Sequence, residues 1–290
     1  MVFPDPNLRQ VRPRFFPFKP RKGFTFPLGS CHGTLALGSQ DGNLDFWNPT
    51  TNQCYSTSLA PDHTRALNRI STRSVLYHDT CSNQYKLVQA VGVGGICEFQ
   101  SYNLEANGFT TFHTLPDIDD HVCHSLRSRR TLSCFVNGAL HWLVPRSGDG
   151  FRSEIVALHL ETLECYKLPL VQYRYCEPTL VVFGGLLCAT FSNCRDGGTR
   201  YDIDVWVMKE YGGEWTRLFN LITPEPHKYV YPIAYSKNRD KVLLHFFSPW
   251  DSLEWYHLKQ EKLIPVNIPG APQYPFQAIL FLPSLVNYQS

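Results

Sequence analysis

The segment DVWVMKEYGGEWTRLFNL, residues 204–221, constrains the fold of this chain more than any other. Val205 and Val207 before Gly212-Gly213, and Trp215, Arg217 and Phe219 after them, follow a period of two, which is typical of a pleated strand. On this pattern Trp215, Arg217 and Phe219 are predicted to share one strand face. The two glycines would supply the positive φ angles of a tight hairpin turn. A lone hairpin cannot bury its apolar face, so other parts of the chain must cover it.

Hairpins of the same kind follow one another along the rest of the chain, and helical patterns are missing. Turn dipeptides such as Asn137-Gly138 and Gly184-Gly185 separate strand-sized apolar runs, which gives about nine hairpins at roughly 25-residue spacing. Serial antiparallel sheets of this kind close as a sandwich or as a propeller. Almost every neighbouring pair is joined by a short turn, which favours the propeller. With about 40 to 45 residues per blade, residues 23–290 would form about six blades.

The composition indicates a folded chain without a nucleic-acid or membrane partner. Hydrophobic residues make up 43% and charged residues 18%, which is enough apolar content for a sizeable core. The net charge of +2 gives no indication of a polyanionic partner, and no apolar run is long enough to cross a membrane. The start shows no apolar signal segment, and the ten cysteines show no Cys-x-x-Cys spacing. Thiols within apolar strands, such as Cys134 and Cys188, favour the cytoplasm or nucleus.

Six segments of the sequence carry a resemblance to a known family. They are LGSCHGTLAL with DFWNPTT, VNGALHWLV, IVALHLETLECYKLPLV, TLVVFGGLLCATF, the hairpin of residues 204–221, and AILFLPSLV. Their order and motifs resemble the F-box-associated domain of plant F-box proteins over Leu28 to Val286. One difference is that His159 and Leu160 stand where the family commonly has Asp-Leu. The turn that follows them is therefore expected to be held by different contacts.

The resemblance implies an all-β, kelch-like β-propeller in residues 23–290, acting as the substrate-recognition module of a Skp–cullin–F-box ubiquitin ligase. Residues 1–22 form a Pro- and Arg-rich lead-in whose prolines disfavour the helices of an F-box. These 290 residues by themselves are therefore expected not to bind a Skp adaptor. Two explanations remain open: a lost F-box, or an upstream segment that this sequence does not include. A chain without an F-box would also fit a binding protein that competes with full F-box homologues.

No catalytic, metal or cofactor site is predicted. The run DIDDHVCHS, residues 117–125, holds possible metal ligands, but no matching Cys/His pair is evident and a solvated loop is expected. Glycosidases use two carboxylates in one pocket, which makes a carbohydrate-acting propeller enzyme the alternative class. The carboxylates that could form such a pair are Asp202, Asp204, Glu210 and Glu214. They are better explained as exposed charges in turns.

Loop residues on a rigid scaffold are the predicted partner-binding positions. Aromatic residues next to charged ones mark two such loops, and aromatic side chains often anchor protein partners. The predicted residues are Tyr173, Arg174, Tyr175, Trp250 and Asp251. Four other tryptophans fall within strand patterns and are expected in the blade core; these are Trp47, Trp142, Trp206 and Trp215.

Overall fold

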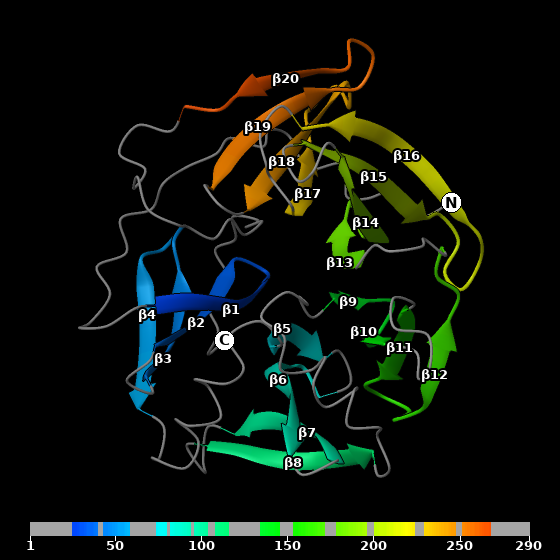
Figure 1. Cartoon of the computed structure of the whole chain (residues 1–290). Coiled ribbons are helices and arrows are strands. Elements are labelled where there is room, and N and C mark those ends of the chain that lie inside the picture. Colours follow the sequence, from blue (N-terminus) through cyan, green and yellow to red (C-terminus); the bar gives the residue numbers. More distant parts are fainter. Residues whose placement is uncertain are drawn as a thin grey trace. The chain divides into compact units, whose positions relative to one another are not determined.

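The computed structural model describes residues 25–39, 43–58, 74–79, 82–93, 96–103, 108–115, 134–145, 153–171, 178–195, 200–223, 229–247 and 251–267. In this part of the chain all regular elements are strands, and no helix that could cross a membrane is found there. The strands form four-stranded antiparallel sheets, each built from strands consecutive in sequence (Figure 1). The all-β class predicted from the hairpin pattern is therefore confirmed.

The described residues form five such sheets, where about six were predicted. The first strands of successive sheets begin at residues 25, 74, 134, 178 and 229. Three of the four intervals between these starts are longer than the predicted blade length of about 40 to 45 residues, so fewer sheets fit into the same chain. The late strand predicted within residues 274–286 lies outside the described residues.

The chain divides into two compact units, and the first contains the described residues between Phe16 and Ser133. It holds two sheets. Their strands are β1 (Thr25–Cys31), β2 (Thr34–Ser39), β3 (Asn43–Asn48) and β4 (Gln53–Ser58), then β5 (Ser74–Asp79), β6 (Gln84–Val93), β7 (Ile96–Asn103) and β8 (Gly108–Leu115).

Side chains from both sheets of the first unit form one apolar cluster. Leu28 and Phe46 from the first sheet pack with Leu76 and Leu87 from the second. The two sheets approach each other closely at Gly29 of β1. A Cβ at this position would lie 2.5 Å from the backbone nitrogen of Leu76 in β5. Only a glycine fits between these two backbones.

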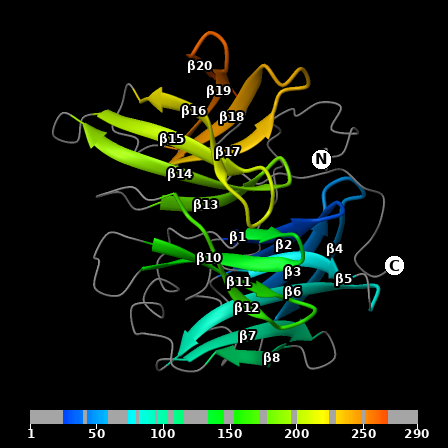
Figure 2. The same cartoon turned by 90° about the vertical axis from the view of Figure 1, so that its right-hand side faces the viewer.

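The second unit contains the described residues between Cys134 and Ala278. Its three sheets follow each other in sequence, and Figure 2 shows the long strands β14 to β16 side by side. The strands are β9 (Cys134–Val136), β10 (Ala139–Pro145), β11 (Ser153–His159), β12 (Cys165–Leu168), β13 (Pro178–Phe183), β14 (Leu186–Arg195), β15 (Arg200–Met208), β16 (Trp215–Ile222), β17 (Tyr229–Tyr235), β18 (Lys241–Phe247), β19 (Ser252–His257) and β20 (Lys262–Pro265).

The β13–β16 sheet is covered on both faces within this unit. One face contributes Phe191 and Met208 to a cluster with Leu143 and Ile155 of the β9–β12 sheet. The opposite face contributes Val205, among others, to a cluster with the β17–β20 sheet. Cys134 and Cys188 lie in these clusters and are buried, which confirms their predicted role as small apolar residues.

The turns joining the strands use backbone conformations that the sequence indicates. Asn137-Gly138 and Gly184-Gly185 have positive φ at both positions, as the hairpin prediction requires. The turn after β11 is held by His159, whose Nδ1 accepts a hydrogen bond from the backbone N–H of Thr162 at 3.3 Å. Asn48 Oδ1 accepts from Thr50 N–H at the corresponding end of β3. The imidazole nitrogen of His159 thus provides the hydrogen-bond acceptor that the carboxylate of an aspartate would provide.

A polar chain connects the β9–β12 and β13–β16 sheets through His141. Its Nδ1 lies 3.1 Å from the carbonyl oxygen of Cys134, which only accepts, so Nδ1 carries the proton. Nε2 of the neutral ring therefore accepts from the hydroxyl of Tyr211 at 2.6 Å. Tyr211 in turn accepts from the hydroxyl of Tyr166 at 2.7 Å. Burial lowers the pKa of His141 to about 4, so the ring is neutral near pH 7.

Candidate functional site

The structure describes one of the five predicted partner-binding residues. Tyr173, Arg174, Tyr175 and Trp250 lie outside the described residues, and their role stays a prediction. The side chain of Asp251 is only 3% exposed, and its Oδ1 lies 3.9 Å from Nε2 of His245. Burial lowers the pKa of His245, and the Asp251 carboxylate opposes this shift. Asp251 therefore directs its carboxylate toward the sheet, and its role in partner binding also stays a prediction.

The four tryptophans expected in the core are where the strand pattern predicts. Trp47 and Trp142 are buried. Trp206 and Trp215 are partly buried and pack against the cluster between the β9–β12 and β13–β16 sheets. The indole N–H of Trp215 also donates to the carbonyl oxygen of Pro169 at 2.7 Å. Trp206 and Trp215 therefore contribute to the packing between two sheets, and the buried Trp47 and Trp142 offer little surface to a partner.

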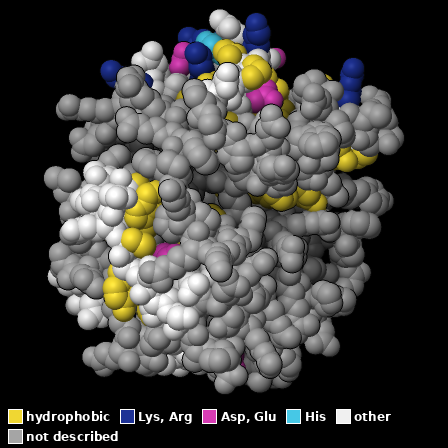
Figure 3. All heavy atoms as spheres, turned by 90° about the vertical axis from the view of Figure 1, so that its left-hand side faces the viewer, with side chains coloured by type: hydrophobic (Ala, Val, Ile, Leu, Met, Phe, Trp, Pro, Cys, Tyr) yellow, Lys and Arg dark blue, Asp and Glu magenta, His cyan; other side chains and the backbone are white. Residues whose placement is uncertain are grey.

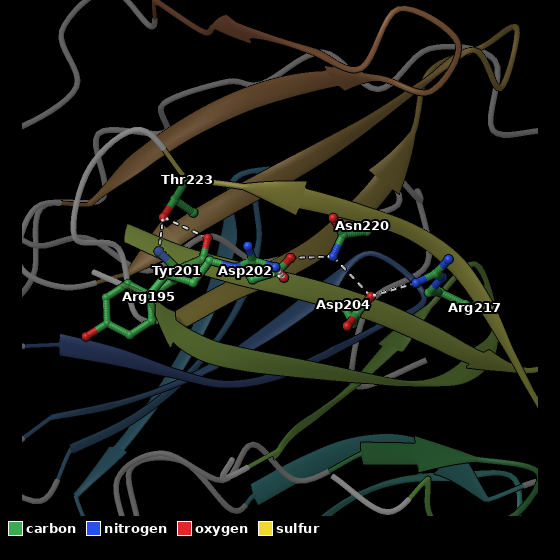
Figure 4. A network of polar contacts seen from close by, with 7 residues as sticks. All are labelled: Arg195, Tyr201, Asp202, Asp204, Arg217, Asn220 and Thr223. Atoms are coloured by element: carbon green, nitrogen blue, oxygen red, sulfur yellow. Dashed lines mark hydrogen bonds and ion pairs between the residues drawn. The ribbon is translucent and has the colours of Figure 1, made fainter. Parts of the chain in front are cut away.

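The candidate site is a polar network on one face of β14, β15 and β16 (Figure 4). Residues directly opposite each other in an antiparallel sheet share a face. Asp204 lies between Phe191 and Asn220 in this register. Asp202 and Arg195 follow on the same face toward the strand ends. The face therefore changes from a buried apolar patch at Phe191 to a polar surface within one sheet.

Two carboxylates and one amide form the centre of the network. Nδ2 of Asn220 donates to Oδ1 of Asp202 at 2.5 Å and to Oδ1 of Asp204 at 3.1 Å. The amide thus bridges two acids that stand two residues apart on β15, and it offsets their repulsion. The backbone carbonyl oxygen of Asn220 accepts from the hydroxyl of Tyr256 at 3.0 Å, which attaches β16 to β19 of the next sheet.

Each of the two carboxylates also binds an arginine, and the two arginines lie at opposite ends of the network (Figure 4). Nε and Nη2 of Arg195 both donate to Oδ2 of Asp202. Nη1 of Arg217 lies 3.5 Å from Oδ1 of Asp204. A guanidinium held through two of its nitrogens has a fixed plane. Arg195 is therefore oriented before any partner arrives.

A register shift between β15 and β16 brings Arg217 into this network. Val205 pairs with Phe219 and Trp206 pairs with Arg217, so Leu218 has no partner across the strand. Such a bulge redirects side chains. Phe219 lies in the core with Val205, whereas Arg217 reaches Asp204 on the opposite face. The prediction that Trp215, Arg217 and Phe219 share one face is therefore wrong at Phe219.

The network corrects the prediction for two of the four acids considered as turn charges. Glu210 and Glu214 are exposed next to the β15–β16 turn, as expected. Asp202 and Asp204 instead lie within β15, with side chains only 15% and 9% exposed. Their alternation with Ile203 in the sequence is the signal of a polar strand face. A comparison of the acids by chemical type alone does not reveal that signal.

Replacing Asn220 with alanine is expected to lower the free energy of unfolding by about 1 to 2 kcal/mol, because two largely buried carboxylates lose a shared donor. Urea denaturation of the variant and the wild type measures this. Raising the salt concentration should recover part of the loss, since salt screens the repulsion between Asp202 and Asp204. Thr216→Ala, at an exposed position on the same strand, is the control and should change stability by less than about 0.5 kcal/mol. An equal loss in both variants would contradict the bridging role.

Comparison with known families identifies the chain over most of its length. Residues 10–277 match the family model described as the F-box associated beta propeller domain. Four-stranded antiparallel sheets in sequence order are the blades of a propeller. The match confirms both the predicted β-propeller and the resemblance on which the functional expectations were based.

Curated relatives are plant F-box proteins. F-box protein CPR1 of Arabidopsis thaliana is 27% identical over 92% of this chain and 69% of its own length. F-box protein At4g22390 of Arabidopsis thaliana is 26% identical over 85% of this chain and 65% of its own length. The chain thus spans about two thirds of each relative. The solved structure of TolB from Acinetobacter baumannii matches with 9% identity and a TM-score of 0.37, covering 86% of this chain and 69% of TolB.

Proposed function

Because this chain belongs to the family of F-box associated β-propeller domains, we propose that it recognises a protein for ubiquitination by a ligase of the Skp–cullin–F-box type. The family match over residues 10–277 is the observation that carries the proposal. Relatives named as F-box proteins support it. In this role the propeller binds the protein to be modified, and the Skp adaptor contacts an F-box. We also propose that the chain acts in the cytoplasm or nucleus.

The arrangement of the polar network supports binding over catalysis. Glycosidic cleavage needs two carboxylates with the scissile bond between them. Here the amide of Asn220 occupies the position between Asp202 and Asp204. Each acid also binds an arginine, so both act as supports for the guanidinium groups. We therefore propose that the chain is a binding module without an enzymatic activity of its own.

Protein turnover in plant cells tests the proposed function. Proximity labelling with the full chain first identifies proteins that bind it. The chain is then expressed joined to the F-box segment of a relative. We expect the abundance of a bound protein to fall, and a proteasome inhibitor to restore it. Bound proteins whose abundance does not change would contradict the proposal.

Expression from the protein's own gene separates the proposed role from that of a competitor. A protein that only sequesters partners from full F-box homologues would raise the abundance of those partners. A substrate-recognition module expressed from the same gene would instead lower partner abundance. The direction of the change in partner abundance therefore decides between the two roles.

A further inference from the structure

From the arginines on β14, β15 and β16, we infer that this sheet face binds an acidic segment of the partner protein, with an apolar residue beside the acidic groups. We call this face the arginine face; it consists of Arg195, Arg200, Arg217, Asn220 and Ile222, supported by Asp202 and Asp204. The inference deepens the proposed function and rests on it, because it assigns the chemistry of the recognised segment.

The charge that the arginine face offers to solvent is positive. The side chains of Arg195 and Arg217 are 55% and 58% exposed, whereas those of their acidic partners are 15% and 9% exposed. The carboxylates are thus turned toward the sheet and the guanidinium groups toward solvent. Exposed charges are the ones that a partner meets first, so the face is complementary to an anionic group.

A third arginine increases this positive charge. Arg200 lies directly opposite Arg195 in the register of β14 and β15, and it is exposed. Like charges placed directly opposite each other destabilise a sheet. Among the residues that the structure describes on this face, three arginines stand beside two acids, which leaves one positive charge in excess. A bound anion would offset the repulsion between Arg195 and Arg200.

The guanidinium of Arg195 is positioned for a planar anionic group. Its described contacts use Nε and Nη2, both directed at Asp202. Nη1 therefore keeps its donors for a partner. A carboxylate or phosphate accepts from such donors in the plane of the guanidinium. Because Asp202 already fixes that plane, binding costs little side-chain entropy.

An exposed apolar side chain lies next to these charges. Ile222 is 53% exposed, the largest value among the exposed large hydrophobic residues that the structure describes. It lies opposite Asp202 and so shares the arginine face. The strand end that carries Ile222 is fixed, because Thr223 N–H donates to the carbonyl oxygen of Tyr201 at 2.9 Å. An apolar anchor beside arginines is typical of the few residues that dominate a protein interface.

The combination of groups favours a peptide over a nucleic acid. A nucleic-acid surface uses many basic residues along a backbone, and here three arginines stand beside two acids and an isoleucine. Figure 3 shows several Lys and Arg side chains, with acidic side chains among them, at the top of its view. Lys237 and Lys259 lie in exposed turns of the β17–β20 sheet, and they provide matched controls for a loss of positive charge.

Binding to a defined peptide array tests the inference. The array carries peptides with Asp and Glu, with phosphoserine, or with the neutral residues Asn, Gln and Ser, each next to Leu, Phe or Ala. The full chain is expected to select anionic peptides that contain Leu or Phe. Selection of the Asp and Glu peptides identifies a carboxylate ligand, and selection of the phosphoserine peptides identifies a phosphate ligand. Equal binding to the neutral peptides would overturn the inference, as would stronger binding to a labelled oligonucleotide.

Substitutions locate the binding on the arginine face. Arg195→Gln and Arg217→Gln should each raise the dissociation constant of a selected peptide about tenfold, as removal of an interface arginine does. The double variant should lose more than either single variant. Lys237→Gln with Lys259→Gln makes the same change in net charge and should leave the affinity unchanged. An equal loss in both double variants would show a general charge effect and overturn the inference.

Two further readouts keep the result interpretable. Circular dichroism and thermal unfolding show whether the arginine variants remain folded. Ile222→Ala is an independent test on the same face, and it should lower the affinity for a selected peptide severalfold. If the arginine face fails these tests while a partner is still degraded through the chain, the proposed function stands and recognition lies elsewhere on the chain. If no protein is degraded, the proposed function itself fails.

Discussion

Replacing Gly29 with alanine is expected to remove about 3 kcal/mol or more from the stability of the first unit. The added Cβ would lie 2.5 Å from the backbone nitrogen and 3.1 Å from the Cβ of Leu76. A flexible side chain could move away, but a backbone atom in a paired strand cannot move without shifting β5. The two sheets would separate and expose the cluster around Leu28 and Leu76. Urea denaturation, or the soluble yield if the variant unfolds, measures the effect.

Gly185→Ala is the control for this prediction. Gly185 has a φ of +79°, which alanine rarely adopts, but a Cβ there meets no atom within 4 Å. The substitution should cost only about 1 to 2 kcal/mol from backbone conformation. Gly29→Ala should therefore be the more destabilising of the two, although Gly29 has no unfavourable φ. The reverse order would show that β1 and β5 do not approach as the structure places them.

Lowering the pH from 7 to 5 is expected to destabilise the second unit by about 2 kcal/mol through His141 alone. Burial lowers the pKa of this ring to about 4, whereas an unfolded histidine titrates near 6.5. The unfolded chain therefore binds more protons between these two pKa values, and stability falls as the pH falls through this window. Below pH 4 the contribution of His141 no longer changes. Urea denaturation at pH 7, 6 and 5 gives the slope.

His141→Gln isolates this contribution. A glutamine amide can donate to the carbonyl oxygen of Cys134 and accept from Tyr211, but it does not titrate. The variant should lose most of the stability difference between pH 7 and pH 5, whatever its stability at pH 7. His245 is also buried with a lowered pKa, so a smaller dependence should remain. A pH dependence equal to that of the wild type would contradict the assignment of His141.

The strands and several turns could be predicted because their signals are local. Alternating residues specify a strand, and Asn137-Gly138 specifies a turn with two positive φ angles, which the structure has. In the hairpin of residues 204–221 only Gly212 has a positive φ. The connection there is longer than a two-residue turn, and Gly213 N–H donates to the carbonyl oxygen of Glu210 at 2.9 Å. The predicted hairpin is correct, and its turn geometry is not.

The candidate site depends on register, which a single sequence does not specify. The alternation of Trp215, Arg217 and Phe219 is unbroken in the sequence, yet the bulge at Leu218 places Arg217 and Phe219 on opposite faces. The pairing of Asp202 with Arg195 and Asn220 likewise needs the alignment of three strands. The predicted partner-binding residues lie in loops of the sequence pattern, whereas the arginine face lies within strands.

Ubiquitin transfer in a purified system tests the central claim most directly. The full chain, joined to the F-box segment of a relative, is combined with a Skp–cullin ligase, ubiquitin and a protein that binds the chain. We predict that this protein acquires ubiquitin, and that it does not when the F-box segment is omitted. A bound protein that stays unmodified in the complete reaction would contradict the proposal that this propeller recognises proteins for ubiquitination.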